Sequence, residues 1–163
     1  MNPPPSANLI IFADLVSCFC DWCENKSTDE NRERDASAWL CKLHDAASSL
    51  PQVSSDYDDD FPELPATLIA KVKNNLAYFN GMYYREFFDP DPNLTDTECM
   101  GDVGDDLMDV YLDLKRGSLY FEQGRVGEAQ WHWVFLHRIH WGRHAVGAIF
   151  ALHCLVISKQ RLS

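Results

Sequence analysis

Basic residues are scarce in this chain of 163 residues, and its first two thirds contain only half of them. Residues 1–110 hold 22 Asp and Glu against 7 Lys and Arg, whereas residues 111–163 hold 3 against 7. The net charge of −11 repels nucleic-acid phosphates and anionic membranes, so neither is an expected partner. The acidic front half leaves a basic protein open as a partner.

Long apolar runs are also missing. The run Leu9–Cys20 is short, contains Asp14, and is not preceded by the basic segment that an export signal requires. The sequence has six cysteines, but nothing else in it points to an oxidising compartment, so we expect free thiols. The sequence therefore predicts a cytoplasmic protein without a membrane segment.

The common catalytic motifs are absent as well. The chain has no GxSxG nucleophile elbow, no phosphate-binding P-loop and no GxGxxG dinucleotide motif. The segment Gly101–Gly104 is rich in glycine, but it enters a helix and lacks the P-loop pattern. Nucleophilic catalysis by a side chain therefore has no clear candidate residue.

What the sequence does have is apolar residues at the spacing of amphipathic helices through most of its length. We expect helices over residues 7–25 and 33–50, a third from 64 that runs on through the aromatic cluster at 83–88, a fourth from 102, and a last stretch over 126–159. Ser6 or Asn8 caps the first helix, Gly117 and Gly124 bracket the end of the fourth, and the last is one bent helix or two broken near Gly142.

These elements predict the fold class and the domain organisation. The predicted fold is an all-α bundle of five or six helices. We expect residues 7–159 to form a single domain, residues 1–6 to be a Pro-rich lead-in that is extended or disordered, and residues 51–63 to be an acidic loop.

A stripe of carboxylates marks the fourth helix. Asp102, Asp106, Asp109 and Asp113 follow one another at helical spacing beside the apolar face, and Asp105 lies a little further round. Carboxylates in this pattern can hold a hard divalent cation if a second acidic segment faces them, and Glu86 with Asp89 is the candidate. The alternative is that the stripe flanks the core and pairs with cationic groups on a neighbouring helix.

A stripe of histidines and indoles marks the last helical stretch. In a continuous helix, Trp133, His137, His140, Trp141 and His144 share one face. His140 and His144 have the i, i+4 spacing of metal-chelating pairs, but the HExxH motif is absent. Histidines on an apolar face are also often core residues with satisfied hydrogen bonds.

The interpretation that we favour joins the two stripes. Asp106, Asp109 and Asp113 then face His137, His140, Arg138 or Arg143 on the adjacent helix, and each carboxylate accepts a hydrogen bond from an imidazole or a guanidinium. Such a seam is structural, and it becomes functional only where it lines a pocket.

A cysteine quartet gives a different metal hypothesis. Cys20 and Cys23 form a CxxC pair, and Cys41 and His44 form a CxxH pair, with 17 residues between the two pairs. Two such pairs at this separation match the ligand spacing of tetrahedral zinc sites. Against zinc, both pairs lie within amphipathic helices instead of tight knuckles, and the chain uses cysteine elsewhere as a small apolar residue.

With these motifs described, the chain resembles a bacterial family known as domain of unknown function 5063. Asp105–Lys115 is similar to the DDLxDIYxDLK-type helix of that family, and His140–His144 with Ala151–His153 resembles its HWGxH…ALxxLH ending. The likeness runs from about Phe12 to His153. It implies an all-helical fold in which the aspartate stripe and the His-Trp-Gly stretch form one unit, and it does not include the cysteine quartet.

These observations leave two classes of function. The first is a protein-binding or regulatory module, for example an inhibitor or immunity-type protein acting on a basic partner, with no cofactor and with a homo-oligomer left open. The second is a metal-dependent hydrolase that uses Asp105, Asp106 and Asp109, or His137, His140 and His144, to hold a divalent metal. We favour the first, because the sequence shows neither a nucleophile nor a clear second acidic motif.

Exposure of particular residues separates the two classes. An enzyme is expected to bring the aspartate and histidine stripes together at an open site. A binding module is expected to expose aromatic residues, which concentrate at protein interfaces. The residues in question are Tyr57, Phe61, Tyr83, Tyr84 and Phe88.

Overall fold

The computed structural model describes residues 5–26, 30–54, 61–95 and 97–161, and in these residues the chain forms six α-helices and one small hairpin. The elements are α1 (Ala7–Glu24), α2 (Arg32–Ser48), α3 (Ala66–Leu76), the 3₁₀ turn η1 (Ala77–Phe79), β1 (Tyr83–Glu86), β2 (Cys99–Asp102), α4 (Val103–Glu122), α5 (Val126–Ile139) and α6 (Trp141–Arg161). The predicted all-α bundle is confirmed. Residues 1–4 of the Pro-rich lead-in and 55–60 of the acidic loop, with Tyr57, lie outside the described residues.

The first two helices begin and end close to where the sequence predicts. The Ser6 side chain accepts a hydrogen bond from the Leu9 backbone N–H at 3.3 Å, so Ser6 is the cap of α1. The inward face of α1 buries Phe12, Val16 and Phe19 completely. On α2 the i, i+3 spacing of apolar residues likewise places them in the core, which the two helices share.

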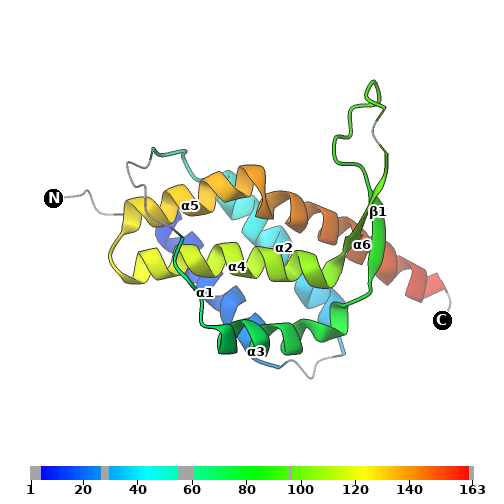
Figure 1. Ribbon diagram of the computed structural model, residues 1–163, viewed down its shortest axis with the longest axis horizontal. Helices are drawn as coiled ribbons and strands as arrows, with labels where there is room; N and C mark the ends of the chain where they lie inside the picture. Colours follow the sequence, from blue (N-terminus) through cyan, green and yellow to red (C-terminus); the bar gives the residue numbers. More distant parts are fainter. Residues whose placement is uncertain (1–4, 27–29, 55–60, 96, 162–163) are drawn as a thin grey trace.

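Helix α4 runs through the middle of the bundle and contacts α1, α5 and α6 (Figure 1). Its buried face includes Leu107, Tyr111 and Leu114, each with no exposed surface. Phe12 of α1 packs edge-on against Trp133 of α5, with ring centroids 5.3 Å apart. The large side chains of four helices therefore meet around α4, which makes α4 the element that positions the others.

Ring N–H groups fasten α5 to α4 and α6 to α5. Trp133 Nε1 donates to the Leu114 carbonyl at 3.0 Å, and Trp141 Nε1 donates to the Trp133 carbonyl at 3.0 Å. His132 Nε2 lies 3.0 Å from the Asp113 carbonyl. Because these bonds join buried groups, the relative positions of α4, α5 and α6 are closely specified.

The predicted third helix is too long. It ends at Leu76, continues as η1 to Phe79, and the chain then turns at Gly81, where φ is +78°. Residues 83–86 form β1 instead of helix, paired antiparallel with β2 in the register Tyr83 with Asp102 and Glu86 with Cys99. The Asp102 side chain accepts from the backbone N–H groups of Gly81 and Gly104, each at 2.8 Å, so one residue holds the turn and caps α4.

Two predicted helix ends agree with the structure. The end of α4 lies between Gly117 and Gly124, because the helix continues through Gly117 to Glu122 and stops before Gly124, where φ is +76°. The last stretch is two helices, as one alternative predicted, but the residue that leaves helical geometry is His140, with φ −142° and ψ −88°. The break therefore comes two residues earlier than Gly142.

Helix α6 has a mixed environment. Its segment Trp141–Lys159 is long and apolar enough to cross a membrane by composition, and 33% of it is buried inside the fold. Core helices of soluble proteins pass the same test, so this finding is weak evidence for a membrane segment, and the expected absence of one stays a prediction.

The close contact at Gly117 gives a test of this packing. A Cβ atom added there would lie 2.1 Å from Trp133 Nε1, and Trp133 is only 1% exposed. We expect Gly117→Ala to lower the free energy of unfolding by about 1–3 kcal/mol, because the indole must move and lose its bond to α4. Gly127→Ala is the matched control, since a Cβ there meets nothing within 4 Å. The measurement is urea unfolding, and equal stability of the two variants would contradict the packing described.

Two buried imidazoles predict how stability depends on pH. Burial lowers the pKa of both His132 and His137 to about 4; for His132 the charge of Arg116 lowers it further, while the bond to the Asp113 carbonyl opposes. In the unfolded chain both pKa values return to about 6.5. Between pH 6.5 and 4 the unfolded state binds protons that the folded state does not, so stability falls as the pH falls.

We expect the loss to be about 1.4 kcal/mol per pH unit for each histidine in this window. Urea unfolding at pH 7, 6 and 5 measures it. His132→Gln should reduce the slope of stability against pH by about the contribution of one proton, which is about 1.4 kcal/mol per pH unit. His153→Gln, at an exposed position of α6, should leave this slope unchanged. A dependence of stability on pH that His132→Gln leaves unchanged would refute this account.

Candidate metal centre between α4 and α6

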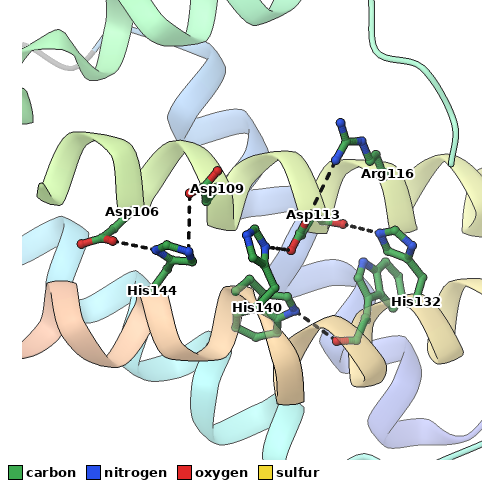
Figure 2. Close-up of polar contacts among 9 residues, drawn as sticks. Asp106, Asp109, Asp113, Arg116, His132, His140 and His144 are labelled. Carbon is green, nitrogen blue, oxygen red and sulfur yellow. Dashed lines mark hydrogen bonds and ion pairs between the residues drawn. The ribbon is translucent and has the colours of Figure 1, made fainter. Parts of the chain in front are cut away.

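The aspartates of α4 face two histidines: His144 of α6, and His140, the residue just before α6 begins (Figure 2). Asp113 Oδ2 lies 2.7 Å from His140 Nδ1, and Asp106 Oδ1 lies 2.8 Å from His144 Nδ1. Both carboxylates are almost completely buried, with 4% and 3% exposure. The seam between an acidic and a histidine-bearing helix is thus present, with His140 and His144 as its imidazoles.

The surroundings shift the pKa values of these groups in understandable directions. The hydrogen bond that His144 donates to Asp106 raises the pKa of His144, burial opposes the rise, and the negative charges of Asp109, Asp106 and Glu86 add to it. Burial raises the pKa of Asp113, although the bond to His140 and the charge of Arg116 lower it. An imidazole whose Nδ1 is hydrogen-bonded to a carboxylate is more basic, and its Nε2 is therefore a better ligand for a metal ion.

The third aspartate of the stripe lies at the open side of the seam. Asp109 Oδ2 is 3.5 Å from Nε2 of His144. One ligand atom each of Asp109, His140 and His144 can be chosen so that all lie within 4.8 Å of one another. Their side chains are 37%, 43% and 29% exposed, so this side of the seam is accessible to solvent. Because carboxylates occupy both Nδ1 atoms, the Nε2 atoms are the ring nitrogens left for a ligand.

The hairpin contributes two residues that the sequence analysis did not assign to the seam. The Tyr84 hydroxyl donates to Asp106 Oδ2 at 2.8 Å, and Glu86 Oε2 lies 3.7 Å from an Arg143 nitrogen. Glu86 was expected to offer a second acidic helix face, but it lies on a strand. The sequence gives no clear signal for either role, because Tyr83-Tyr84-Arg85-Glu86 does not alternate in polarity and only the folded strand shows its two faces.

One version of the predicted seam had Arg143 facing the aspartates, but in the structure Arg143 does not face them. Its guanidinium donates to the backbone carbonyls of Phe87 and Phe88 and lies 3.8 Å from the centre of the Phe88 ring. Arg138 also points away, and donates to Gln52 at 2.6 Å. The seam therefore relies on imidazoles, and Arg143 instead fastens the end of β1 to α6.

His137 does not belong to the seam either. Its Nε2 lies 3.0 Å from Nδ1 of His44 on α2, and its ring contacts Trp141, which is fully buried. The prediction that His137, His140 and His144 share one face assumed a continuous helix and is wrong, because the chain leaves helical geometry at His140. Trp141 is likewise a core residue beside the seam.

The remaining aspartates of the stripe have separate roles. Asp102 caps α4, as described above. Asp105 is exposed and lines a shallow hollow with Lys73 and Asn80, away from the histidines. Of the three ligands that this version of the hydrolase hypothesis named, Asp105, Asp106 and Asp109, only Asp109 lies at the open side of the seam.

The cysteine quartet does not come together. Cys20 and Cys23 are buried in the core, where burial raises the pKa of Cys20 to about 12 and that of Cys23 well above its usual range. Cys41 is exposed, and His44 is bonded to His137. In the part of the chain that the structure describes, these four residues form no cluster of three close ligand atoms. Spacing along two helices could not show that the pairs face different ways.

Two imidazoles and a carboxylate are a donor set that transition metals use in proteins. Three protein ligands leave coordination positions for water or substrate, as in catalytic zinc sites, and the same set holds iron in many oxygenases. The arrangement can therefore hold a metal that still reacts.

Comparison with known proteins agrees with this picture at the level of the fold. No protein of curated function matches the chain. The crystal structure of protein BF1032 from Bacteroides fragilis is similar with a TM-score of 0.73 and 20% sequence identity, over 92% of this chain and 95% of that one. At this identity the likeness shows a shared fold. A family model matches residues 4–158, and the chain therefore belongs to the family described as a domain of unknown function, DUF5063.

Proposed function

We propose that this protein binds a divalent transition-metal ion through Nε2 of His140, Nε2 of His144 and the carboxylate of Asp109, and that it is a metal-dependent hydrolase. One observation carries the proposal. Each histidine has its Nδ1 held by a buried carboxylate, at 2.7 Å and 2.8 Å, and the Nε2 of His144 lies beside the third aspartate, Asp109. Metal-binding histidines almost always have such an outer partner, which fixes the ring and raises its basicity.

A purely structural seam accounts for less of the geometry. The pairs Asp113–His140 and Asp106–His144 already satisfy the buried charges of α4. Asp109 is not needed for this, since it is partly exposed and its 3.5 Å contact with His144 is the longest of the three. Its position next to Nε2 of His144 is what a third metal ligand requires.

The donor atoms select the class of metal. Mg²⁺ and Ca²⁺ prefer oxygen ligands throughout. Imidazole nitrogen is a good ligand for zinc, cobalt and iron, and a weaker one for manganese. A set of two nitrogens and one carboxylate oxygen favours this second group, with zinc as the commonest metal for hydrolysis.

Such a metal ion would supply the nucleophile that the sequence lacks. A bound metal lowers the pKa of its water so that hydroxide forms near neutral pH, and it polarises the oxygen of the bond under attack. Held by His140, His144 and Asp109, the ion would activate water for attack on a carbonyl or phosphoryl centre; the bond to the leaving group would break, and the proton of the water would pass to the leaving group. Glu86, whose negative charge acts on His144, is the carboxylate that we propose as the acceptor of the proton of the water.

A protein-binding role is the second candidate, and the hairpin supports it. Tyr83, Phe88 and Met100 are 66%, 72% and 71% exposed. Phe61 is also exposed, whereas Tyr84 points inward. Exposed aromatic residues favour a protein partner. Tyr83 and Met100 lie on the face of the hairpin opposite to Tyr84 and Glu86, which point towards the metal centre, so the two functions are compatible.

Metal binding by the untagged protein is the first test. We expect about one equivalent of zinc, cobalt or manganese per chain, measured by titration and elemental analysis. His140→Ala, His144→Ala and Asp109→Ala should weaken binding by more than the roughly 10–100-fold typical of a lost outer partner. His153→Ala is the control, because His153 is an exposed histidine of the same helix. If all three variants bound the metal as tightly as the wild type, the metal would have to lie elsewhere.

Hydrolysis is the second test. The metal-loaded protein should cleave chromogenic esters or phosphodiesters at a rate that disappears with a chelator and returns with added metal. Asp109→Asn should lose this activity while its melting temperature without metal stays near that of the wild type, since Asp109 is partly exposed. A metal-loaded protein inactive on carboxylic ester, amide and phosphoester substrates would argue against a hydrolase and leave metal binding as the function.

A further inference from the structure

Tyr84 is placed where the hairpin meets the metal centre. The strand β1 alternates between two faces: Tyr83 and Arg85 point to solvent, whereas Tyr84 and Glu86 point towards α4 and α6. The Tyr84 hydroxyl donates to Asp106 Oδ2 at 2.8 Å. The other oxygen of the same carboxylate, Oδ1, is bonded to His144 Nδ1 at 2.8 Å.

The two bonds together fix the carboxylate. With one donor on each oxygen, Asp106 cannot rotate about its χ2 angle without losing a bond, and a buried oxygen that loses its partner is costly. The direction of Asp106 Oδ1 in turn sets the plane of the His144 ring. The orientation of His144 Nε2 therefore depends on a hydroxyl that lies on another element of the fold.

The chain makes room for this tyrosine at two places. A Cβ atom at Gly101 of β2 would lie 2.4 Å from Tyr84 Cζ, and a Cβ atom at Gly147 of α6 would lie 2.3 Å from the Tyr84 oxygen. Only glycine allows the ring to pass over the strand and the hydroxyl to pass over the helix. Two elements are thus shaped around the path of the Tyr84 side chain from the hairpin to Asp106.

We propose that Tyr84 is a positioning residue of the metal centre, which rests on the proposed function, and that the hairpin formed by β1 and β2 thereby sets the affinity of the centre for its metal. Tyr84 orients His144 through Asp106 and does not touch the metal. Arg143 holds the end of β1 against α6, because its guanidinium donates to the Phe87 carbonyl and approaches Glu86. Burial and the charge of Asp106 raise the pKa of Tyr84, so its hydroxyl stays a donor.

A role in packing alone makes a different prediction. Tyr84 is partly buried against the core, and phenylalanine would fill nearly the same volume. If packing were its role, Tyr84→Phe would change stability without changing metal affinity. If Tyr84 positions His144, the loss of one oxygen atom weakens metal binding.

The experiment compares Tyr84→Phe with Tyr83→Phe in the full chain. Tyr83 is the matched control, because it is the neighbouring tyrosine of the same strand and points to solvent. Affinities for Co²⁺ and Zn²⁺ are measured by competition with a chromogenic chelator, and melting temperatures are measured without metal. We expect Tyr84→Phe to bind both ions roughly 10–100-fold more weakly and Tyr83→Phe to bind as the wild type does.

The outcomes separate this inference from the proposed function. A wild type that binds neither ion overturns both. A wild type that binds, with Tyr84→Phe of equal affinity, overturns the role of Tyr84 and leaves the metal centre standing. Gly147→Ala gives a second measurement if Tyr84→Phe folds poorly, since it displaces the hydroxyl while keeping the tyrosine. We expect it to weaken Co²⁺ binding similarly and to change the visible absorption of the bound ion, and an unchanged affinity and spectrum would count against the proposal.

Discussion

Asp106 and Asp113 lie almost entirely out of water, and the contact between α4 and α6 depends on how their charges are satisfied. A buried carboxylate without a partner costs several kcal/mol, about 3–5 kcal/mol when one member of a pair is removed. Each has an imidazole at hydrogen-bond distance, and the two pairs lie seven residues apart on α4 and four apart on the facing chain. A shift of either helix by one residue would separate both pairs, so they fix the register in which the large core residues meet.

The residues of this seam could be predicted from sequence because they obey local rules. Helical spacing placed Asp106, Asp109 and Asp113 on one stripe, and i, i+4 spacing paired His140 with His144. The break was predicted near Gly142 only as one of two alternatives, and its place at His140 was not predicted, because apolar residues continue at helical spacing on both sides of it. This is why His137 was assigned to the wrong face: its real partner, His44, lies 93 positions away in the sequence.

The hairpin was missed for a related reason. Four residues are too few to show a period, and aromatic side chains suit a helix as well as a strand. The pairing of β1 with β2 joins residues that are 13 to 19 positions apart across an irregular loop, which no local pattern encodes. Its two faces nevertheless explain why a mostly helical protein keeps a strand: alternation lets one short segment offer Tyr84 to the interior and Tyr83 to the solvent.

His140 is at once the corner between α5 and α6 and a candidate ligand. One added or deleted residue at this corner would turn α6 by about 100° about its axis and carry His144 away from α4. The length of the chain here is therefore constrained far more tightly than the length of the loop between β1 and β2, which reaches away from the bundle (Figure 1). Among relatives that keep this site, we expect insertions and deletions to accumulate in that loop and to be missing from the corner.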